Sequence, residues 1–231
     1  MGRKERRLAA AVLVCAATVC AAALGAEATV AAAALPVGEI QWVLDAGHGG
    51  EDGGAVSPSG VVESQINLEI TRRLDSVLGF CGEAAIMLRD EDTSLHDPGA
   101  VTLREKKASD LHNRASAVQA FPEATLISIH QNSFPQAQYR GTQVFYAPTE
   151  GSQALAQAIQ AAVQAKLQQE NTRESKPIPE TVYLLNHIPN RAVLVECGFL
   201  SNPEDEAALQ ERGYQLQVAL LLAECCLQDT A

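Results

Sequence analysis

The chain has 231 residues, 47% of them hydrophobic and 19% charged, which suffices for one well-buried globular domain and excludes a disordered or collagen-like chain. The first 35 residues hold four of the 17 basic and two of the 28 acidic residues, leaving 13 basic and 26 acidic residues for the body. A body with a net charge of −13 lacks the clustered Lys and Arg that phosphate contacts need. Nucleic-acid binding is therefore excluded.

The amino terminus has the pattern of an export signal. A basic stretch at residues 1–7 precedes an apolar run at 8–26, with small-residue sites such as Gly25-Ala26 after it. A run of this length also suits a membrane anchor, since a span needs about 20 residues. We therefore expect residues 1–35 to be a signal peptide or an N-terminal membrane anchor. Either one places a folded domain over residues 39–228 outside the cytoplasm, in contact with a membrane only if the anchor is kept.

Along the body, short apolar runs alternate with longer segments whose apolar residues recur at helical spacing. The pattern predicts a strand at 41–45, a helix at 63–78, a strand at 84–88 and a helix at 103–120. Strands follow at 124–129 and 142–146, then a helix whose apolar face is Leu155, Ile159, Val163 and Leu167. The rest is a proline loop at 176–179, strands at 182–185 and 192–195, and a helix at 204–227 interrupted near Gly213. Strands alternating with helices predict a single α/β domain.

The body contains four cysteines whose spacing matches no zinc-finger or redox motif: Cys81, Cys197, Cys225 and Cys226. One disulfide between distant cysteines could form in an oxidising compartment. The favoured interpretation is four small buried hydrophobic residues.

Four polar residues stand beside apolar runs where chemistry is expected. His48 follows the first strand inside a glycine cluster, and His130 follows the strand that ends in LISI. Glu196 ends the strand AVLV, and Glu63 opens the first helix. Because functional groups of open α/β sheets collect at the carboxyl ends of strands, these side chains are candidates to converge.

Two imidazoles and one carboxylate form a known catalytic zinc set that leaves a position for water. Glu196 would then move the proton during amide hydrolysis. The spacing alone is weak evidence, because no HExxH helix links two ligands. Alternatively, Glu63 is a favourable charge at a helix amino terminus, and Glu196 is a structural residue paired with Arg191 or Arg114. The other histidines, His96, His112 and His187, are interpreted as solvated.

Taken together, the sequence motifs of the body resemble those of a known enzyme family. The segments VLDAGHGGEDGGAV (43–56), SIHQNS (128–133), RGTQVFY (140–146) and AVLVECGFLSNPEDEAAL (192–209), with Glu63 and Asn67-Leu68, resemble the zinc-dependent N-acetylmuramoyl-L-alanine amidases of the amidase-3 family. Four motifs occur in the family's order over about residues 43–222, nearly the whole body. The resemblance is therefore highly specific.

The resemblance implies a twisted, mixed sheet of about six strands, flanked by helices on both faces. It implies Zn²⁺ ligands at His48, Glu63 and His130, and a general acid/base at Glu196. The implied reaction splits the amide between the lactyl group of N-acetylmuramic acid and L-alanine in peptidoglycan. Gln131 stands where the family usually has Ala, and Cys197 where it usually has Val. Because neither departure replaces a ligand, we expect them to affect the choice of substrate rather than the activity itself.

The segments SIHQNSF and YLLNH are most similar to those of the sporulation subgroup. The absence of wall-binding repeats is also typical of that subgroup. That subgroup trims muramic acid in spore cortex so that muramic-δ-lactam can form, a step that later licenses germination. This similarity implies a cortex deacetylase as a co-acting partner. Since no long insertion separates the metal motifs, the site is expected to be open or activated by a partner protein. Alternatives are a vegetative autolysin, a zinc peptidase acting on the stem peptide, and a non-enzymatic wall-binding module.

Overall fold

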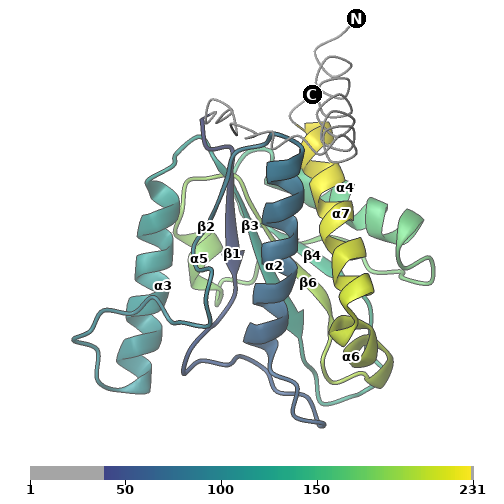
Figure 1. Cartoon of the computed structure of the whole chain (residues 1–231), viewed down its shortest axis with the longest axis horizontal. Coiled ribbons are helices and arrows are strands. Elements are labelled where there is room, and N and C mark those ends of the chain that lie inside the picture. The colour runs from purple at the N-terminus through teal and green to yellow at the C-terminus, as the bar shows by residue number, and fades with distance from the viewer. Residues whose placement is uncertain (1–38, 230–231) are drawn as a thin grey trace, which may run out of the picture. The chain divides into compact units, whose positions relative to one another are not determined.

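The computed structural model describes residues 39–229, which form one compact unit (Figure 1). The apolar run at 8–26, and the signal or anchor expected over 1–35, lie outside the described residues. Within residues 39–229, no helix has both the length and the apolar character that a membrane span requires.

A six-stranded mixed sheet forms the centre of the domain, in the order β2-β1-β3-β6-β4-β5. Neighbours among the first four strands run parallel, whereas β4 runs antiparallel to β6, and β5 is parallel to β4. The carboxyl ends of β1, β3 and β6 therefore share one edge of the sheet with the start of β4. The strands are β1 (Trp42–Ala46), β2 (Ala85–Met87), β3 (Thr125–Asn132), β4 (Gln143–Tyr146), β5 (Lys176–Pro177) and β6 (Ala192–Phe199).

Helices cover both faces of this sheet. One face packs against α2 (Glu63–Phe80), α4 (Ser152–Lys166) and α7 (Arg212–Asp229), and the opposite face packs against α3 (Leu103–Gln119) and α5 (Tyr183–Asn186). The remaining helix, α6 (Pro203–Gln210), follows β6 and begins with Asn202 as a side-chain cap. The predicted α/β class, with a mixed six-stranded sheet between helices, is confirmed.

Alternation along the strands sends neighbouring residues to opposite faces. In β1, Leu44 joins the core beneath α2 and α7, while Val43 joins the core beneath α3 and α5. Trp42 to Ala46 are all buried because both faces of this strand are covered. This burial explains why β1 is a nearly continuous apolar run in the sequence.

Two local predictions were wrong. Residues 182–185 were expected to be a strand, but Tyr183–Asn186 form the short helix α5, whose Leu184 and Leu185 enter the core beneath α3. The proline loop contributes the two-residue edge strand β5, where Pro177 is tolerated because an edge strand needs no donor there. The predicted interruption of the last helix near Gly213 is confirmed: it lies at Glu211, so α6 and α7 are separate helices.

Candidate metal centre

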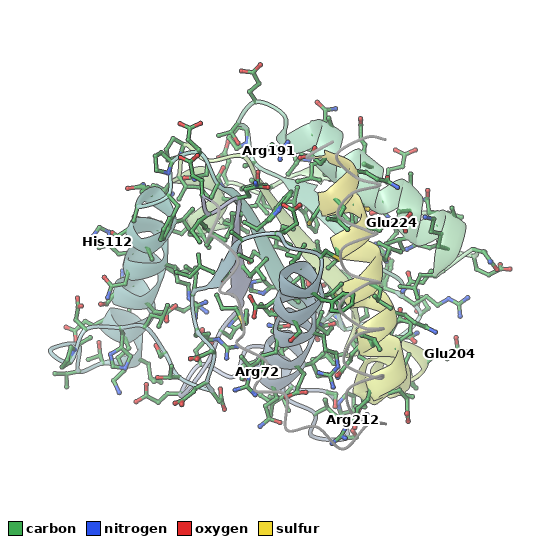
Figure 2. The ribbon with its side chains drawn as sticks, turned by 45° about the horizontal axis from the view of Figure 1, so that its top comes forward. Arg72, His112, Arg191, Glu204, Arg212 and Glu224 are labelled. Carbon is green, nitrogen blue, oxygen red and sulfur yellow. The ribbon has the colours of Figure 1, made fainter. Side chains whose placement is uncertain are left out.

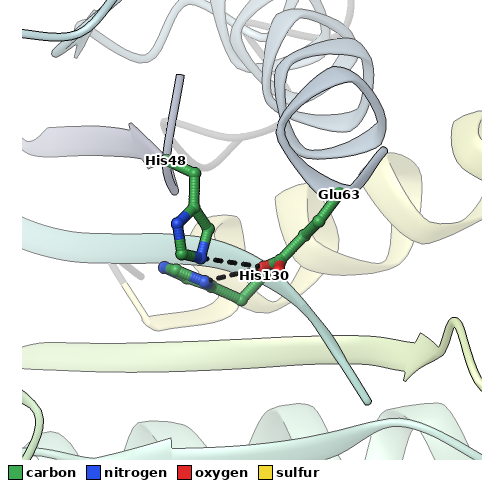
Figure 3. A group of neighbouring side chains, drawn as sticks. All are labelled: His48, Glu63 and His130. Atoms are coloured by element: carbon green, nitrogen blue, oxygen red, sulfur yellow. Dashed lines mark hydrogen bonds and ion pairs between the residues drawn. The ribbon is translucent and has the colours of Figure 1, made fainter. Parts of the chain in front are cut away.

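The three residues expected to bind metal lie together at the carboxyl edge of the sheet (Figure 3). Each offers one donor atom, and all three donor atoms lie within 4.8 Å of one another. Glu63 Oε1 lies 3.3 Å from Nε2 of His48 and 3.0 Å from Nδ1 of His130. Residues that are 15 and 82 positions away from His48 in the chain thus present their donors to one point.

His48 occupies a sharp turn after β1. Its φ of 62° lies in the left-handed region, which costs a non-glycine residue free energy unless the surroundings enforce it. Asp52 provides one such restraint, since its Oδ2 lies 3.0 Å from Nδ1 of His48. Burial works to lower the pKa of His48, but the hydrogen bonds to Asp52 and Glu63 outweigh it and raise this pKa to about 9.

Glu63 opens α2 with its carboxylate buried among hydrogen-bond donors. Its Oε2 accepts from the backbone N–H of Ala55 at 2.8 Å, and its Oε1 accepts from the backbone N–H of Gln131 at 3.1 Å. Asn67, one helical turn later, donates its side-chain amide to Oε1 at 3.3 Å. Burial alone would raise the pKa of Glu63, but the two histidines hold it well below its usual range. Glu63 is therefore a fixed anion at the centre of the group.

Two glycines leave room for the ligand side chains. A Cβ on Gly47 would lie 2.2 Å from the His130 ring, so only glycine lets this ring pack against the turn. A Cβ on Gly54 would lie 2.5 Å from Oε2 of Glu63 and 2.7 Å from Cδ2 of His48. The glycines at positions 47 and 54 thus serve the packing of the candidate ligands.

Glu196 stands beside this group on the neighbouring strand. It pairs with His130 across β3 and β6, so both side chains leave the same face of the sheet. Burial raises the pKa of Glu196 to about 7, and its Oε2 is a buried atom with no hydrogen-bond partner among residues 39–229. Arg114 and Arg191, the structural partners considered for Glu196, are instead bound to Asp45 and Asp229. Glu196 is therefore an uncompensated carboxyl group that faces the histidines.

Two buried arginines stabilise the turn at His48 by donating hydrogen bonds to its backbone carbonyl oxygens. Arg114 from α3 pairs with the buried Asp45 and donates to the carbonyl oxygens of Ala46 and His48. Arg89 donates to the carbonyls of Ala46 and Gly47 at 2.8 and 3.0 Å, and to that of Ser64, beside Glu63, at 2.9 Å. Arg89 and Asp52 were not predicted as supports of the site, and Asn67 was named only as part of a sequence motif. Only Asp52 and Asn67 carried a signal, because each lies four positions after a candidate ligand.

The four body cysteines, by contrast, take no part in the site. Cys81, Cys197 and Cys225 are free thiols, and Cys197, Cys225 and Cys226 are buried while Cys81 is half-buried. Burial raises the pKa of the Cys197 thiol to about 12, which keeps it neutral and unreactive. The interpretation as small hydrophobic residues holds for the three buried ones.

Two imidazoles, a fixed carboxylate and a second, protonatable carboxyl group at one sheet edge are the residue types of a metal-dependent hydrolase. A family model described as N-acetylmuramoyl-L-alanine amidase matches residues 43–226. The chain therefore belongs to the amidase-3 family of N-acetylmuramoyl-L-alanine amidases and is such an enzyme, with peptidoglycan as its substrate.

Similar proteins agree with this assignment. Over 177 residues the chain is 35% identical to the germination-specific N-acetylmuramoyl-L-alanine amidase of Bacillus subtilis strain 168, covering 76% of this chain and 73% of that protein. The CwlD amidase from Clostridioides difficile, solved in complex with the GerS lipoprotein, matches with a TM-score of 0.78 and 34% identity over 81% of this chain and 96% of that one. The catalytic domain of CwlV from Bacillus (Paenibacillus) polymyxa var. colistinus matches with a TM-score of 0.69 and 26% identity, over 82% and 97% of the two chains.

Proposed function

We propose that this amidase is zinc-dependent, with His48, Glu63 and His130 as the metal ligands and Glu196 as the general acid/base. The donor set supports zinc, because two neutral imidazoles and one carboxylate leave a fourth tetrahedral position open. The hydrogen-bond partners of the ligands support it too, since the carboxylate of Asp52 orients His48 and the amide of Asn67 orients Glu63. When bound, the zinc ion would polarise the scissile carbonyl and make water more acidic.

The observation that carries the proposal is the buried, unpartnered oxygen of Glu196 beside the three donors. A carboxyl group whose pKa is about 7 can both accept and return a proton near neutral pH. Glu196 would take the proton from the attacking water and deliver it to the nitrogen of L-alanine as the amide breaks. The carboxylate needs no rearrangement for either step, because no hydrogen bond holds that oxygen elsewhere.

Digestion of peptidoglycan with residues 39–229 tests the reaction. Mass spectrometry should find stem peptides that begin with intact L-alanine and glycan with free lactyl groups. Stem peptides cut between their own amino acids would instead identify a zinc peptidase. Unaltered sacculi that merely retain the protein would identify a wall-binding module.

Two variants separate metal binding from proton transfer. His48→Ala should lose the roughly one zinc per chain that the wild-type protein carries. Glu196→Gln should keep its zinc and lose about 10²–10⁴-fold in turnover, the usual contribution of acid/base catalysis. Retention of most turnover in Glu196→Gln would assign the proton transfer to another residue.

We further propose that the enzyme acts outside the cytoplasm on spore cortex, in the step that prepares muramic-δ-lactam. The similarity to a germination-specific amidase supports this role. The lactam joins the lactyl carboxyl, which the amidase releases, to an amine that a deacetylase must expose. Purified enzyme should therefore digest cortex sacculi faster than vegetative sacculi and yield lactam only when a deacetylase is added. Equal digestion of both would favour a vegetative autolysin.

We also propose an activator protein as a partner, because the similar CwlD amidase was solved in complex with the GerS lipoprotein. If residues 39–229 alone are active, and no co-expressed lipoprotein increases that activity, the proposal of an activator protein is contradicted. Export through residues 1–35 is testable by fractionation of a tagged full-length chain, with cleavage distinguishing a signal from an anchor.

A further inference from the structure

A row of polar side chains crosses the sheet at the edge that carries the metal centre. Glu196 on β6 is paired with His130 on β3 and, on its other side, with Gln143 on β4. Directly paired residues project from the same face of a sheet, with about 5 Å between neighbours. The row therefore runs from a candidate zinc ligand, through the proposed acid/base, to Gln143.

Arg173 extends this row by one more residue. It lies in the loop between α4 and β5, and β5 pairs with β4, so the loop reaches the same edge of the sheet. Nη1 of Arg173 donates to Oε1 of Gln143 at 2.9 Å, and its Nε donates to the carbonyl oxygen of Arg140 at 2.8 Å. The guanidinium carbon lies 4.5 Å from the centre of the Phe199 ring, so the group is stacked as well as hydrogen-bonded.

Arg173 forms no direct ion pair with the described residues, although the carboxylate of Asp205 is near enough to interact with its charge. Among residues 39–229, no carboxylate forms an ion pair with it, and its Nη2 donates to no other residue. The cations on the opposite side of the metal centre differ, since Lys106 pairs with Glu51 and Lys107 pairs with Asp52. A half-buried guanidinium that is fixed on two sides and open on the third is preorganised to accept an anion.

We propose that Arg173 binds a carboxylate of the stem peptide, on the residue that follows L-alanine. The inference rests on the proposed amidase function and adds to it the direction in which the substrate lies. The peptide is the part of the substrate that carries free carboxylates, because the lactyl carboxyl is consumed in the scissile amide. A body with 26 acidic and 13 basic residues repels an anionic peptide, so a local unpaired cation is needed to hold it.

The exposed rings of Phe134 and Tyr139 form a rim beside this position. They are 46% and 42% exposed, and the Tyr139 ring lies 4.9 Å from Phe134 and 6.5 Å from Phe199. Apolar rings next to Arg173 reduce the water around its guanidinium and strengthen a charge-assisted hydrogen bond to a carboxylate.

The test uses two stem peptides that begin with L-alanine and differ only at the second residue, with a free α-carboxylate or its carboxamide. Calorimetric binding to the zinc-loaded protein should be about ten-fold tighter for the carboxylate, as expected for a hydrogen bond to a charged group. Arg173→Gln should remove that preference, and Arg173→Lys should retain part of it. Arg212→Gln is the matched control: it removes one exposed arginine from the start of α7 (Figure 2), which forms no ion pair within the described part of the chain, and should leave the preference intact.

Hydrolysis of the corresponding muropeptides provides the second measurement. Arg173→Gln should raise KM for the carboxylate substrate about ten-fold while kcat stays near the wild-type value. Equal binding of the two peptides by the wild-type protein would overturn the proposal, as would an unchanged preference in Arg173→Gln. Because binding is measured without turnover, a protein that shows the preference but cannot hydrolyse the amide would refute the proposed function alone.

Discussion

Oδ2 of Asp52 lies 3.0 Å from Nδ1 of His48, and this contact determines which nitrogen of the imidazole faces the candidate metal centre. With Nδ1 engaged, Nε2 is the atom that lies 3.3 Å from Oε1 of Glu63. Asp52 is itself restrained, because its Oδ1 accepts from the backbone N–H of Gly54 at 3.3 Å. A carboxylate behind a histidine ligand fixes both the tautomer and the orientation of the ring.

Asp52→Ala should therefore weaken zinc binding about 10–100-fold, the usual effect of removing such a supporting group. Competition titration with a chromogenic chelator measures the affinity. Glu51→Gln is the matched control, because this neighbouring carboxylate is exposed and contacts Lys106 and His96 rather than a candidate ligand. Equal affinities of Asp52→Ala and the wild-type protein would mean that the backbone alone orients His48.

The sequence predicted the candidate ligands because each stands next to a recognisable element. His48 follows β1, His130 lies near the end of β3 and Glu63 begins α2, so their convergence follows from parallel strands that share one carboxyl edge. Asp52 could have been found from its spacing to His48. Arg173 could not, because its place depends on the pairing of a two-residue edge strand that no periodicity reveals.

Short elements were also where the secondary structure was predicted incorrectly. Four residues with Leu184 and Leu185 at the centre fit a buried strand as well as one helical turn, since both bury two adjacent apolar residues. The outcome was decided by packing against α3, where Ala115 and Val118 offer a core for a helix. Longer elements such as α2 and β6 left no such ambiguity.

Gly54→Ala should disrupt the metal centre more than Gly60→Ala. Both glycines have positive φ, 71° and 94°, so alanine costs each turn about 1–2 kcal/mol of stability. Only at Gly54 would the new Cβ collide with Glu63 and His48, because Gly60 has no atom within 4 Å of that position. We expect a large loss of zinc affinity in Gly54→Ala and near wild-type affinity in Gly60→Ala, measured beside chemical unfolding of both. Matching zinc affinities would show that the collision is relieved by a small backbone shift.

Arg114→Met should destabilise the protein by about 3–5 kcal/mol, because it leaves the buried Asp45 carboxylate without its counter-charge. Ser128 also donates to Asp45 at 2.6 Å, but a hydroxyl cannot neutralise the charge. The double variant Asp45→Asn with Arg114→Met should recover part of the loss, since the buried charge of Asp45 is then gone and only Asp110 still lacks its partner Arg114. Urea unfolding of Arg114→Met, Asp45→Asn and the double variant gives the coupling energy. Additive losses would mean that the main role of Arg114 is to hold the carbonyls of Ala46 and His48.

Zinc binding should release a proton at pH 7, because the metal-free protein holds His48 with a pKa of about 9. Burial lowers this pKa, and the hydrogen bonds to Asp52 and Glu63 more than compensate. The ring is then a cation at neutral pH and must lose its proton to become a ligand. In the metal-free protein, the stability gained from this charge is complete below about pH 6.5 and is lost as the pH rises through about 9.

Deprotonation of His48 alone should accordingly raise the zinc affinity about ten-fold per pH unit between pH 7 and 9. Above that range the affinity should no longer depend on this group. Calorimetry at pH 7 in two buffers of different ionisation enthalpy counts the protons released per zinc. Asp52→Ala removes one of the contacts that raise this pKa, so it should release a smaller fraction of a proton at the same pH. Identical proton release from both proteins would show that Glu63 alone keeps His48 protonated before the metal binds.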